Sequence, residues 1–261
     1  MHLAGKKAFI SGSTKGIGYA IAQALLAEGA SVIINGRNDD TLQEVVLRLQ
    51  QGRRTETVSG IAADFADPAQ VERLLEQLGE VDILVNNVGM FELAAFGDIP
   101  DAEWQRYFEV HVMSGVRLSR QVLNGMIARN WGRILFIGSE SGVNVPQDMI
   151  HYGVAKAGML ALSNGLAKLT RGTAVTVNTI LGGPTYSDGV AGTVSAIAEA
   201  QSMSTHELKA AIIGGNQTTL LERFIEPAEI ANLAVYLASP LASATNGAAL
   251  RADGGVLTTL T

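Results

Sequence analysis

Tyr152 and Lys156 are the residues of this sequence whose types and spacing most directly suggest chemistry. They stand at an i, i+4 spacing, so in a helix both side chains lie on one face. A free phenol has a pKa of about 10, too high for a general base near neutral pH. A neighbouring ammonium lowers that pKa, so the pair could exchange a proton with a carbonyl or alcohol oxygen. Such a pair also occurs by chance on surface helices, so its meaning depends on its surroundings.

Further polar residues follow short apolar segments, at positions where a strand would end. Ser139 follows the apolar segment 133–137, and its hydroxyl could hydrogen-bond the same reacting oxygen. Asn87 follows the segment 81–85 in the same way. Because ligands in an open α/β sheet bind beyond the carboxyl ends of the strands, we expect these side chains to meet there.

A glycine-rich turn follows the first apolar segment, residues 8–10. Its glycines permit a tight turn and a close approach to a pyrophosphate, and the next helix presents free N–H groups to the phosphates. The spacing G-x3-G-x-G differs from G-x-G-x-x-G, and no Gly-Lys-Ser/Thr closes it as in a P-loop. Taken alone, the turn is equally compatible with a structural role. As a cofactor site it would involve Gly12, Ser13, Thr14, Lys15, Gly16, Ile17 and Gly18.

The end of the second apolar segment, residues 31–35, bears on which cofactor would bind. An acidic residue there would hold the ribose 2′-hydroxyl of NAD, but this chain has Arg37. A guanidinium can bind a 2′-phosphate as a planar fork, and Lys15 could reach the same group. Asp39 and Asp40 are interpreted as first-turn helix residues. The sequence therefore predicts NADP(H) rather than NAD(H), with a solvated surface arginine as the alternative.

The elements that position these residues alternate along the chain. This alternation predicts an α/β fold with a mostly parallel sheet, in which central strands read as continuous apolar runs. No linker or repeat divides the chain, so 1–261 is expected to be a single domain. Strands are expected at 8–11, 31–35, 58–62, 81–85, 133–137, 174–180 and 248–251, and helices at 17–27, 41–50, 68–78, 103–129, 151–170 and 227–238.

Residues from about 185 to 222 break this rhythm, since they show no strand pattern. An insertion after the sixth strand would lie near the ligand side of the sheet. We therefore expect a substrate lid here, although a helical surface excursion without a role is the alternative. Glu140, Val145 and Gln147 are expected to line the substrate pocket together with this lid.

Composition narrows the classes of partner. The formal net charge is −6, so nothing in the charge favours nucleic acid. There is no polybasic run, no apolar stretch long enough to span a membrane, and no signal-peptide pattern at the start, so residence in the cytoplasm is expected. The chain has no cysteines, which removes disulfides and thiolate metal sites. No metal is expected in the chemistry.

Taken together, these residues resemble the short-chain dehydrogenase/reductase family, over about residues 5 to 256. Within the family, the chain looks like compact carbonyl reductases and 3-oxoacyl reductases. The resemblance implies a three-layer αβα Rossmann-type fold with a seven-stranded sheet ordered 3-2-1-4-5-6-7, and commonly a homotetramer. The residues that carry it are Gly12, Gly16, Gly18, Asp64, Asn86, Asn87, Val88, Gly89, Ser139, Tyr152, Lys156, Asn246, Gly247, Asp253, Gly254 and Gly255.

The same resemblance implies a role for each residue. Tyr152 is the acid/base, Lys156 lowers its pKa and binds the nicotinamide ribose, and Ser139 orients the substrate oxygen. Asp64 and Phe65 would hold the adenine. Further cofactor contacts are implied for Asn87, Gly89, Gly183, Thr185 and Ser187.

Three residues depart from the family's pattern. His111 stands where the family usually has an asparagine that supports a water chain to the lysine; it is interpreted as a variant member of that relay, as a sign of weakened catalysis, or as a buried histidine bonded to the backbone. Gly182 replaces a proline and would add backbone freedom where the nicotinamide amide docks. Ser11 replaces a threonine and keeps a hydroxyl.

The function expected from these observations is NADPH-dependent, reversible reduction of a ketone or keto ester to a secondary alcohol, with a small carbonyl or alcohol compound as the partner. The alternative is a catalytically weak protein of the same fold that binds NADP(H) as a sensor or regulatory scaffold. Ser139, Tyr152 and Lys156 favour the first reading, and His111 and Gly182 leave the second open.

Overall fold

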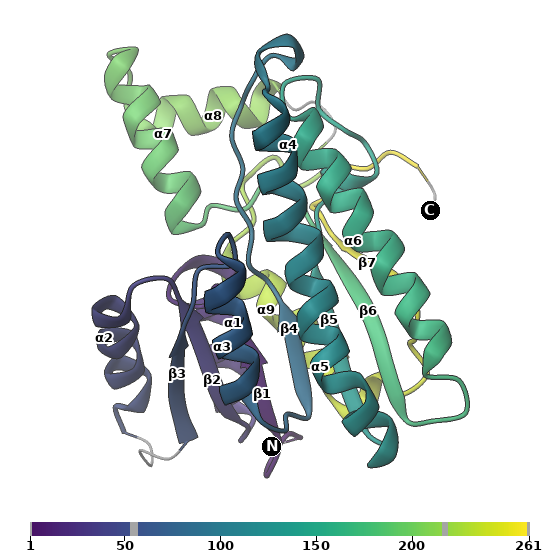
Figure 1. Cartoon of the computed structure of the whole chain (residues 1–261). Helices are drawn as coiled ribbons and strands as arrows, with labels where there is room; N and C mark the ends of the chain where they lie inside the picture. The colour runs from purple at the N-terminus through teal and green to yellow at the C-terminus, as the bar shows by residue number, and fades with distance from the viewer. Residues whose placement is uncertain (1, 53–56, 216–218, 260–261) are drawn as a thin grey trace.

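The computed structural model describes residues 2–52, 57–215 and 219–259 (Figure 1). Its centre is a seven-stranded parallel sheet in the order β3-β2-β1-β4-β5-β6-β7, which confirms the predicted fold class and strand order. The strands are β1 (Lys7–Ile10), β2 (Ser31–Gly36), β3 (Val58–Ala62), β4 (Ile83–Asn86), β5 (Gly132–Ile137), β6 (Val175–Gly182) and β7 (Ala249–Ala252).

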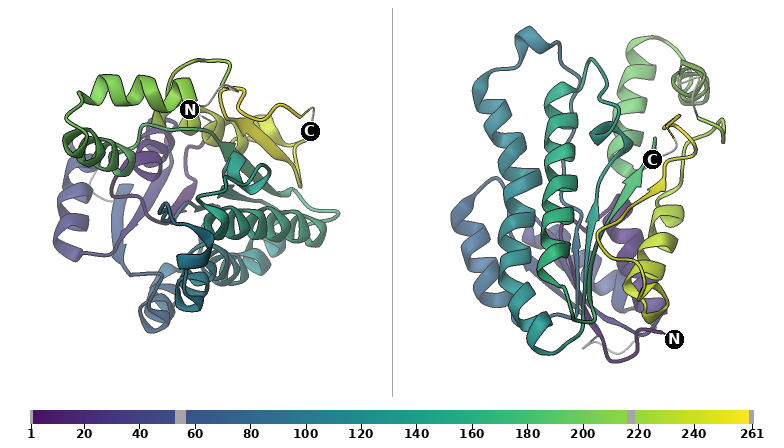
Figure 2. Two further views of the ribbon diagram at one scale, coloured as in Figure 1. Left: turned by 90° about the horizontal axis from the view of Figure 1, so that it is seen from above. Right: turned by 90° about the vertical axis from the view of Figure 1, so that its right-hand side faces the viewer.

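Helices cover both faces of the sheet, as the two further views show (Figure 2). α1, α2 and α9 bury apolar side chains against one face, and α3, α5 and α6 against the other. The described helices are α1 (Gly16–Ala27), α2 (Asp39–Gln50), α3 (Pro68–Leu78), α4 (Asp101–Tyr107), α5 (Ser114–Ala128), α6 (Ile150–Leu169), α7 (Asp188–Ala200), α8 (Thr205–Gly215) and α9 (Pro227–Ala238), with short 3₁₀ turns at Phe96–Asp98, Glu140–Gly142 and Pro240–Ala242.

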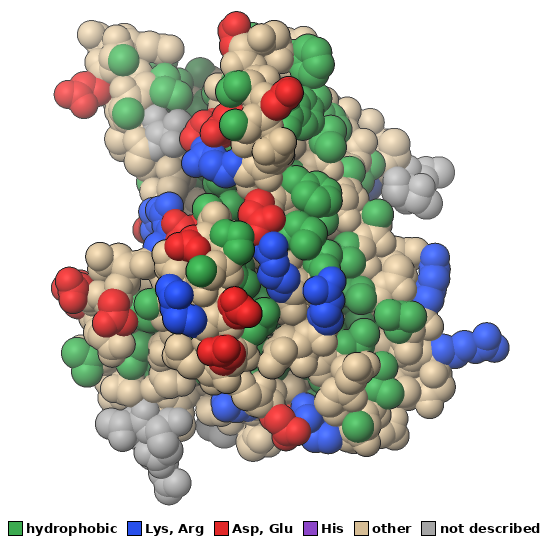
Figure 3. Space-filling model, in the orientation of Figure 1, with side chains coloured by type: hydrophobic (Ala, Val, Ile, Leu, Met, Phe, Trp, Pro, Cys, Tyr) green, Lys and Arg blue, Asp and Glu red, His purple; other side chains and the backbone are tan. Residues whose placement is uncertain are grey.

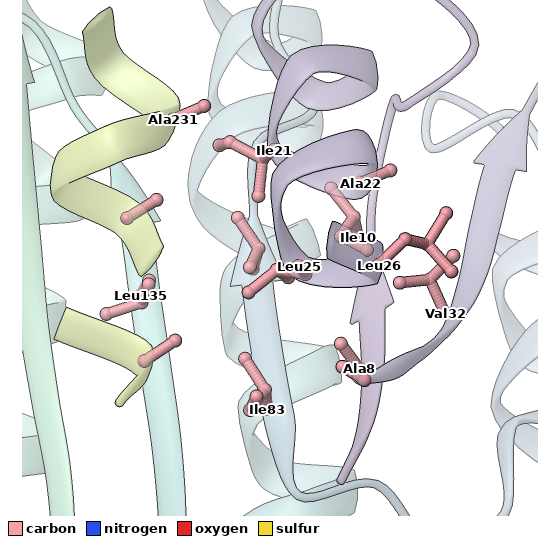
Figure 4. Packing of buried hydrophobic residues seen from close by; sticks show 14 of the residues in the cluster. Ala8, Ile10, Ile21, Ala22, Leu25, Leu26, Val32, Ile83, Leu135 and Ala231 are labelled. Carbon is pink, nitrogen blue, oxygen red and sulfur yellow. The ribbon is translucent and has the colours of Figure 1, made fainter. Parts of the chain in front are cut away.

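The packing of the first face explains why the glycine-rich turn is held firmly. Ile21 and Leu25 of α1 lie between that helix and α9, where Ala231 sits (Figure 4). β1 and β4, beneath α1, contribute fully buried apolar residues such as Ile10 and Ile83. Burial of apolar surface on this scale stabilises the fold at about 25 cal/mol per Å². The start of α1, where a ligand would bind, is therefore fixed to the core.

The expected long helix 103–129 is interrupted. Between α4 and α5 the backbone forms a π-helical turn, Phe108–Met113, which the sequence did not predict. The Ser114 hydroxyl donates to the carbonyl oxygens of Val110, at 2.6 Å, and of His111, at 3.4 Å. Such hydroxyls compete with the helical N–H groups for a carbonyl, and π turns are frequent at functional sites.

The segment after β6 forms α7 and α8, which stand above the carboxyl ends of the strands (Figure 1). The two helices share a small core of their own, made by Val194, Ala198 and Leu208. β6 itself runs to Gly182, beyond the expected end at 180. Within the described residues, no helix combines the length and apolar character needed to cross a bilayer.

Candidate active site

A cleft of about 440 Å³ lies at the carboxyl ends of the central strands. It brings together most of the residues singled out by the sequence, from the glycine-rich turn to the Tyr/Lys pair. Several predicted residues do not line this cleft: Ser13, Gly18, Ser139, Gly183 and Thr185, and also the expected pocket residues Glu140, Val145 and Gln147. Among the predicted residues, its walls include Gly12, Thr14, Lys15, Gly16, Ile17, Arg37, Asp64, Phe65, Asn87, Gly89, His111, Tyr152, Lys156 and Ser187.

The glycine-rich turn is shaped by close contacts with the loop after β4. Gly12 and Gly16 have positive φ values of 60° and 59°, a region that disfavours other residues. A Cβ at Gly18 would lie 2.5 Å from the side-chain nitrogen of Asn87. That nitrogen donates to the carbonyls of Ser11 and Gly12, at 2.9 and 2.8 Å. Asn87 therefore holds the turn in place.

Ser11 and Ser13, the two serines of the turn, form hydrogen bonds with backbone groups that hold the turn in place. The Ser11 hydroxyl accepts hydrogen bonds from the N–H groups of Asn87, at 2.9 Å, and Val88, at 3.0 Å. The hydroxyl that Ser11 keeps in place of the family's threonine therefore bonds to the loop after β4. Ser13 is fully buried, and its hydroxyl donates to the carbonyl of Ile10 at 2.7 Å. Ser13 supports the turn from below.

Asn35 is a site residue that the sequence reading missed. Its side-chain oxygen accepts from the N–H of Gly12 at 2.9 Å, and its amide donates to the carbonyls of Ile61 and Ala63 at 3.0 and 3.3 Å. One buried side chain thereby links the ends of β1, β2 and β3. At Gly36 a Cβ would lie 2.5 Å from Thr14, so the chain after Asn35 is also packed against the turn.

One end of the cleft is basic. Lys15 and Arg37 both line it, and both side chains are exposed. Asp39 and Asp40 fall in the first turn of α2, as expected, and the Asn38 side chain caps this helix by accepting from the N–H of Thr41 at 2.8 Å. Asp64 lies across the cleft and accepts from the N–H of Ala66 at 2.9 Å. A group with a 2′-phosphate would meet two cations here.

The opposite end contains Tyr152 and Lys156, which α6 presents on one face. The Lys156 ammonium donates to the carbonyl of Ile137 at 2.8 Å and lies 5.6 Å from the centre of the Tyr152 ring. Burial lowers the pKa of Lys156 to about 8. Burial raises the pKa of the Tyr152 phenol, and a hydrogen bond with Ser139 acts against that rise.

The net direction of the Tyr152 pKa is thus set by burial, which outweighs the lowering expected from Lys156. The ammonium is bonded to the Ile137 carbonyl, and burial disfavours the charged form of both side chains. In this structure the phenol is therefore neutral at pH 7 and has a proton to donate.

Ser139 lies just beyond β5 and is 6% exposed. Its hydroxyl donates to the carboxylate of Glu140, and its oxygen accepts from the N–H of Ser141 at 3.1 Å. The predicted catalytic serine is thus close to Tyr152 but is also bonded to a neighbouring acid that the motifs did not include.

His111 lies in the π-helical turn and is fully buried. Its Nε2 atom is 2.9 Å from the carbonyl oxygen of Met90, and its Nδ1 atom has no hydrogen-bond partner among the described residues. Burial lowers its pKa to about 3, and the charge of Lys156 adds to that shift. A Cβ at Gly89 would lie 2.9 Å from the imidazole and 3.7 Å from the Lys156 nitrogen, so both side chains converge on this glycine.

Gly182 was expected to add backbone freedom in the turn after β6, but the structure places it in the strand. This glycine is the last residue of β6, paired with Ala252, so its backbone is held in the sheet rather than freed in a turn. The close approach occurs one residue later, where a Cβ at Gly183 would lie 2.4 Å from the carbonyl oxygen of Asp253. Thr185 is buried and donates to the carbonyl of Gly183 at 2.9 Å.

The segment expected to form a lid touches the glycine-rich turn. A Cβ at Gly16 would lie 3.3 Å from the Cβ of Ser187, and the N–H of Gly16 donates to the Asp188 carboxylate at 2.7 Å. The first residues of α7 therefore stand at the N-terminus of α1, where phosphates are expected to bind.

The residues present fit a dinucleotide. A Cβ at Gly12 would lie 3.0 Å from the backbone of Val88, so the turn lets the backbone itself line the cleft. The N-terminus of α1 provides N–H groups for phosphates. Lys15 and Arg37 lie at one end of the cleft, and Tyr152 and Lys156 lie at the other.

A parallel sheet of this order, with a glycine-rich cleft leading to a tyrosine and a lysine, defines an α/β oxidoreductase. Residues 6–197 match the sequence profile described as short chain dehydrogenase. The chain belongs to the short-chain dehydrogenase/reductase family and is an oxidoreductase.

Relatives extend over the whole chain. It is 43% identical over 258 residues to the uncharacterized oxidoreductase YvaG of Bacillus subtilis (strain 168), covering 98% of each protein. It is 32% identical over 261 residues to the 3-oxoacyl-acyl-carrier-protein reductase FabG of Escherichia coli (strain K12), covering 98% of the chain and 99% of FabG. A solved structure of L-sorbose reductase from Gluconobacter frateurii, complexed with NADPH and L-sorbose, is 33% identical, with a TM-score of 0.93 and full coverage of both chains.

Proposed function

We propose that this chain is an NADPH-dependent reductase that converts a ketone or keto ester to a secondary alcohol, reversibly. The observation that carries the proposal is the single cleft that joins Arg37 and Lys15 at one end to Tyr152 and Lys156 at the other. The similar L-sorbose reductase was solved with NADPH, which supports the same cofactor here. When bound, the reduced nicotinamide supplies a hydride to the carbonyl carbon.

In this proposal the proton that reaches the carbonyl oxygen is supplied by side chains of the protein. Tyr152, whose pKa is raised by burial, donates its proton to the carbonyl oxygen during reduction. The Lys156 ammonium, 5.6 Å from the phenol ring centre, stabilises the phenolate that remains. Ser139 lies within hydrogen-bond reach of Tyr152 and orients the substrate oxygen. In the oxidative direction the same phenolate accepts the proton of the alcohol.

His111 has a supporting role in this proposal. With a pKa near 3 it is neutral at pH 7, so it does not carry a positive charge in a relay. When its Nε2–H donates to Met90, its Nδ1 lone pair is available to a water molecule beside Lys156. His111 would then hold the water that the family's asparagine supports, rather than transfer the proton itself.

The test is NADPH oxidation with a panel of ketones, keto esters and acyl thioesters, using the wild type and Tyr152→Phe. The phenylalanine variant keeps the ring but has no proton to donate, so we expect kcat to fall by about 10²–10⁴-fold. NADPH binding, followed by nicotinamide fluorescence, should be unchanged. Normal turnover by Tyr152→Phe would contradict the mechanism. NADPH binding without turnover of any panel member would instead support the sensor or scaffold alternative.

A further inference from the structure

Glu140 is a carboxylate placed directly against the catalytic serine. One of its oxygens accepts the hydroxyl of Ser139, and the other accepts the hydroxyl of Ser141 at 3.2 Å. The N–H of Ser141 donates to the Ser139 oxygen at 3.1 Å, which fixes the serine from a second direction. The carboxylate is half-buried at the end of β5 and belongs to none of the motifs that define the family's chemistry.

The position of Ser139 fixes the position of Glu140 relative to the substrate. In the proposed function the Ser139 hydroxyl donates its one proton to the reacting oxygen instead of to Glu140, which leaves a Glu140 carboxylate oxygen free beside that hydroxyl to accept from a substrate group. The electrostatics agree: burial dominates the pKa values of Tyr152 and Lys156, and the Glu140 charge raises both. A carboxylate that influences both groups lies close to them, beside Ser139 and just outside the residues that line the cleft.

This carboxylate forms no ion pair with a basic side chain within the part of the chain that the structure describes, although its charge raises the pKa of Lys156. The ion pairs there involve other carboxylates, such as Glu92 with Arg106 and Glu109 with Arg117. An ionised carboxylate can accept about four hydrogen bonds, and the two serine hydroxyls occupy only part of that capacity. Glu140 thus offers a charged acceptor with unused capacity beside Ser139.

We propose that Glu140 determines substrate class, favouring neutral ketones with a hydroxyl on the carbon beside the carbonyl and disfavouring keto acids. The inference rests on the proposed function. A hydroxyl in that position would donate to the carboxylate, and hydrogen bonds to charged acceptors are among the stronger ones. A substrate carboxylate would instead meet a like charge in a partly desolvated site, which is a repulsive element of specificity.

Two matched pairs of compounds separate the favourable hydrogen bond to a substrate hydroxyl from the repulsion of a substrate carboxylate. Butan-2-one and 1-hydroxybutan-2-one differ by one hydroxyl, and methyl acetoacetate and acetoacetate differ by one charge. kcat/KM would be measured for all four with NADPH in the wild type, Glu140→Gln and Glu140→Asp. Asp148→Asn is the control, because it removes an exposed negative charge from the same loop without touching Ser139.

The wild type should favour the hydroxyketone over butan-2-one by about tenfold or more in kcat/KM. In Glu140→Gln this ratio should fall at least about fivefold, because the neutral amide is a weaker acceptor, and the ratio of acetoacetate to methyl acetoacetate should rise by a similar factor. Glu140→Asp should retain much of the wild-type discrimination, and Asp148→Asn all of it. Melting temperature and NADPH binding would establish that each variant is folded.

Ratios that are the same in Glu140→Gln as in the wild type would overturn the inference while leaving the proposed function standing. Equal changes in Asp148→Asn would also overturn it, since they would reflect general charge rather than this carboxylate. If the wild type oxidises NADPH with none of the four ketones or the wider panel, the proposed function itself fails and the inference fails with it.

Discussion

We propose that cofactor choice depends on Arg37 more than on any other single residue. Its guanidinium lines the basic end of the cleft. Lys15, the second cation predicted to meet a 2′-phosphate, lines the same end. A guanidinium can bind a phosphate through two parallel hydrogen bonds, whereas a lysine ammonium acts as a point charge. The preference for NADPH should therefore be lost mainly through this side chain.

Arg37→Ala should lower kcat/KM for NADPH by about 10- to 100-fold, the range expected for a lost hydrogen bond to a charged group. The value for NADH should stay within about threefold of the wild type, since NADH has no group for Arg37 to bind. Steady-state kinetics with both cofactors measure this. Arg48→Ala, at the other end of α2, is the control. A uniform loss for both cofactors would mean that Arg37 acts structurally.

Lys156 shows the cost of placing an ammonium in the core. Its pKa of about 8, against 10.5 when solvated, means that the unfolded chain binds the proton more tightly than the folded one. The folded state is therefore penalised below about pH 8, and its stability rises as pH increases from about 8 to 10.5. The residue is retained although it destabilises the fold, which is consistent with a role in chemistry.

Lys156→Met should raise the free energy of unfolding at pH 7 by about 1–3 kcal/mol and should abolish turnover. The gain is smaller than the full pKa shift implies, because the bond to the Ile137 carbonyl is lost as well. It should shrink as pH rises through the same window. Urea unfolding at pH 7, 9 and 10.5 measures both trends. A gain that does not vary with pH would argue against a buried charge as its cause.

Among the elements, the contact between α7 and the glycine-rich turn has a direct consequence for binding. The Asp188 carboxylate accepts from the N–H of Gly16 at the N-terminus of α1. A cofactor diphosphate would use the same N–H groups and would meet the same negative charge. We therefore expect the first turn of α7 to compete with the cofactor for these N–H groups.

Asp188→Asn should tighten NADPH binding by about three- to tenfold, because it removes one negative charge near the phosphates. The improvement should be smaller at high salt, where charges are screened. A fluorescence titration at two salt concentrations measures both effects. Glu199→Gln, which removes a charge at the far end of α7, should leave the affinity unchanged. Weaker binding in Asp188→Asn would show that the carboxylate supports the bound state instead.

The elements were predictable where burial dictates the residue pattern. β5 is buried along its whole length and reads as an apolar run, and Pro68 with its Asp67 cap marks the start of α3. The π-helical turn was not predictable, because it depends on how Ser114 bonds in the folded helix. A hydroxyl at that position is compatible with an ordinary helix as well.

The candidate site was predictable where residue type and spacing carry the chemistry, as in Tyr152 and Lys156. Asn35 was missed because its side-chain bonds reach the ends of two other strands, β1 and β3, and no local pattern distinguishes it from an asparagine in a turn. The link between Ser139 and Glu140 was also missed, since side-chain direction after a strand is decided by packing. Its only signal in the sequence was an acid directly after the motif serine.

At the scale of the whole molecule, one face bears apolar side chains that the single chain does not cover. Phe108 and Val154 are 53% and 52% exposed, although both lie on elements packed against each other. Figure 3 shows apolar side chains over the face formed by α4, α5 and α6. Exposed apolar surface of this kind favours association between copies of a chain.

We propose that the chain is a homotetramer that uses this face. Its native mass should be four times the 27.4 kDa of one chain, measured by sedimentation or light scattering. Val154→Glu places a charge in the centre of the buried interface, so it should yield smaller species. Leu47→Glu is the matched control, because Leu47 is 65% exposed on α2, away from this face. A tetramer that survives Val154→Glu, or a wild type that sediments as a monomer, would contradict the assignment of this face.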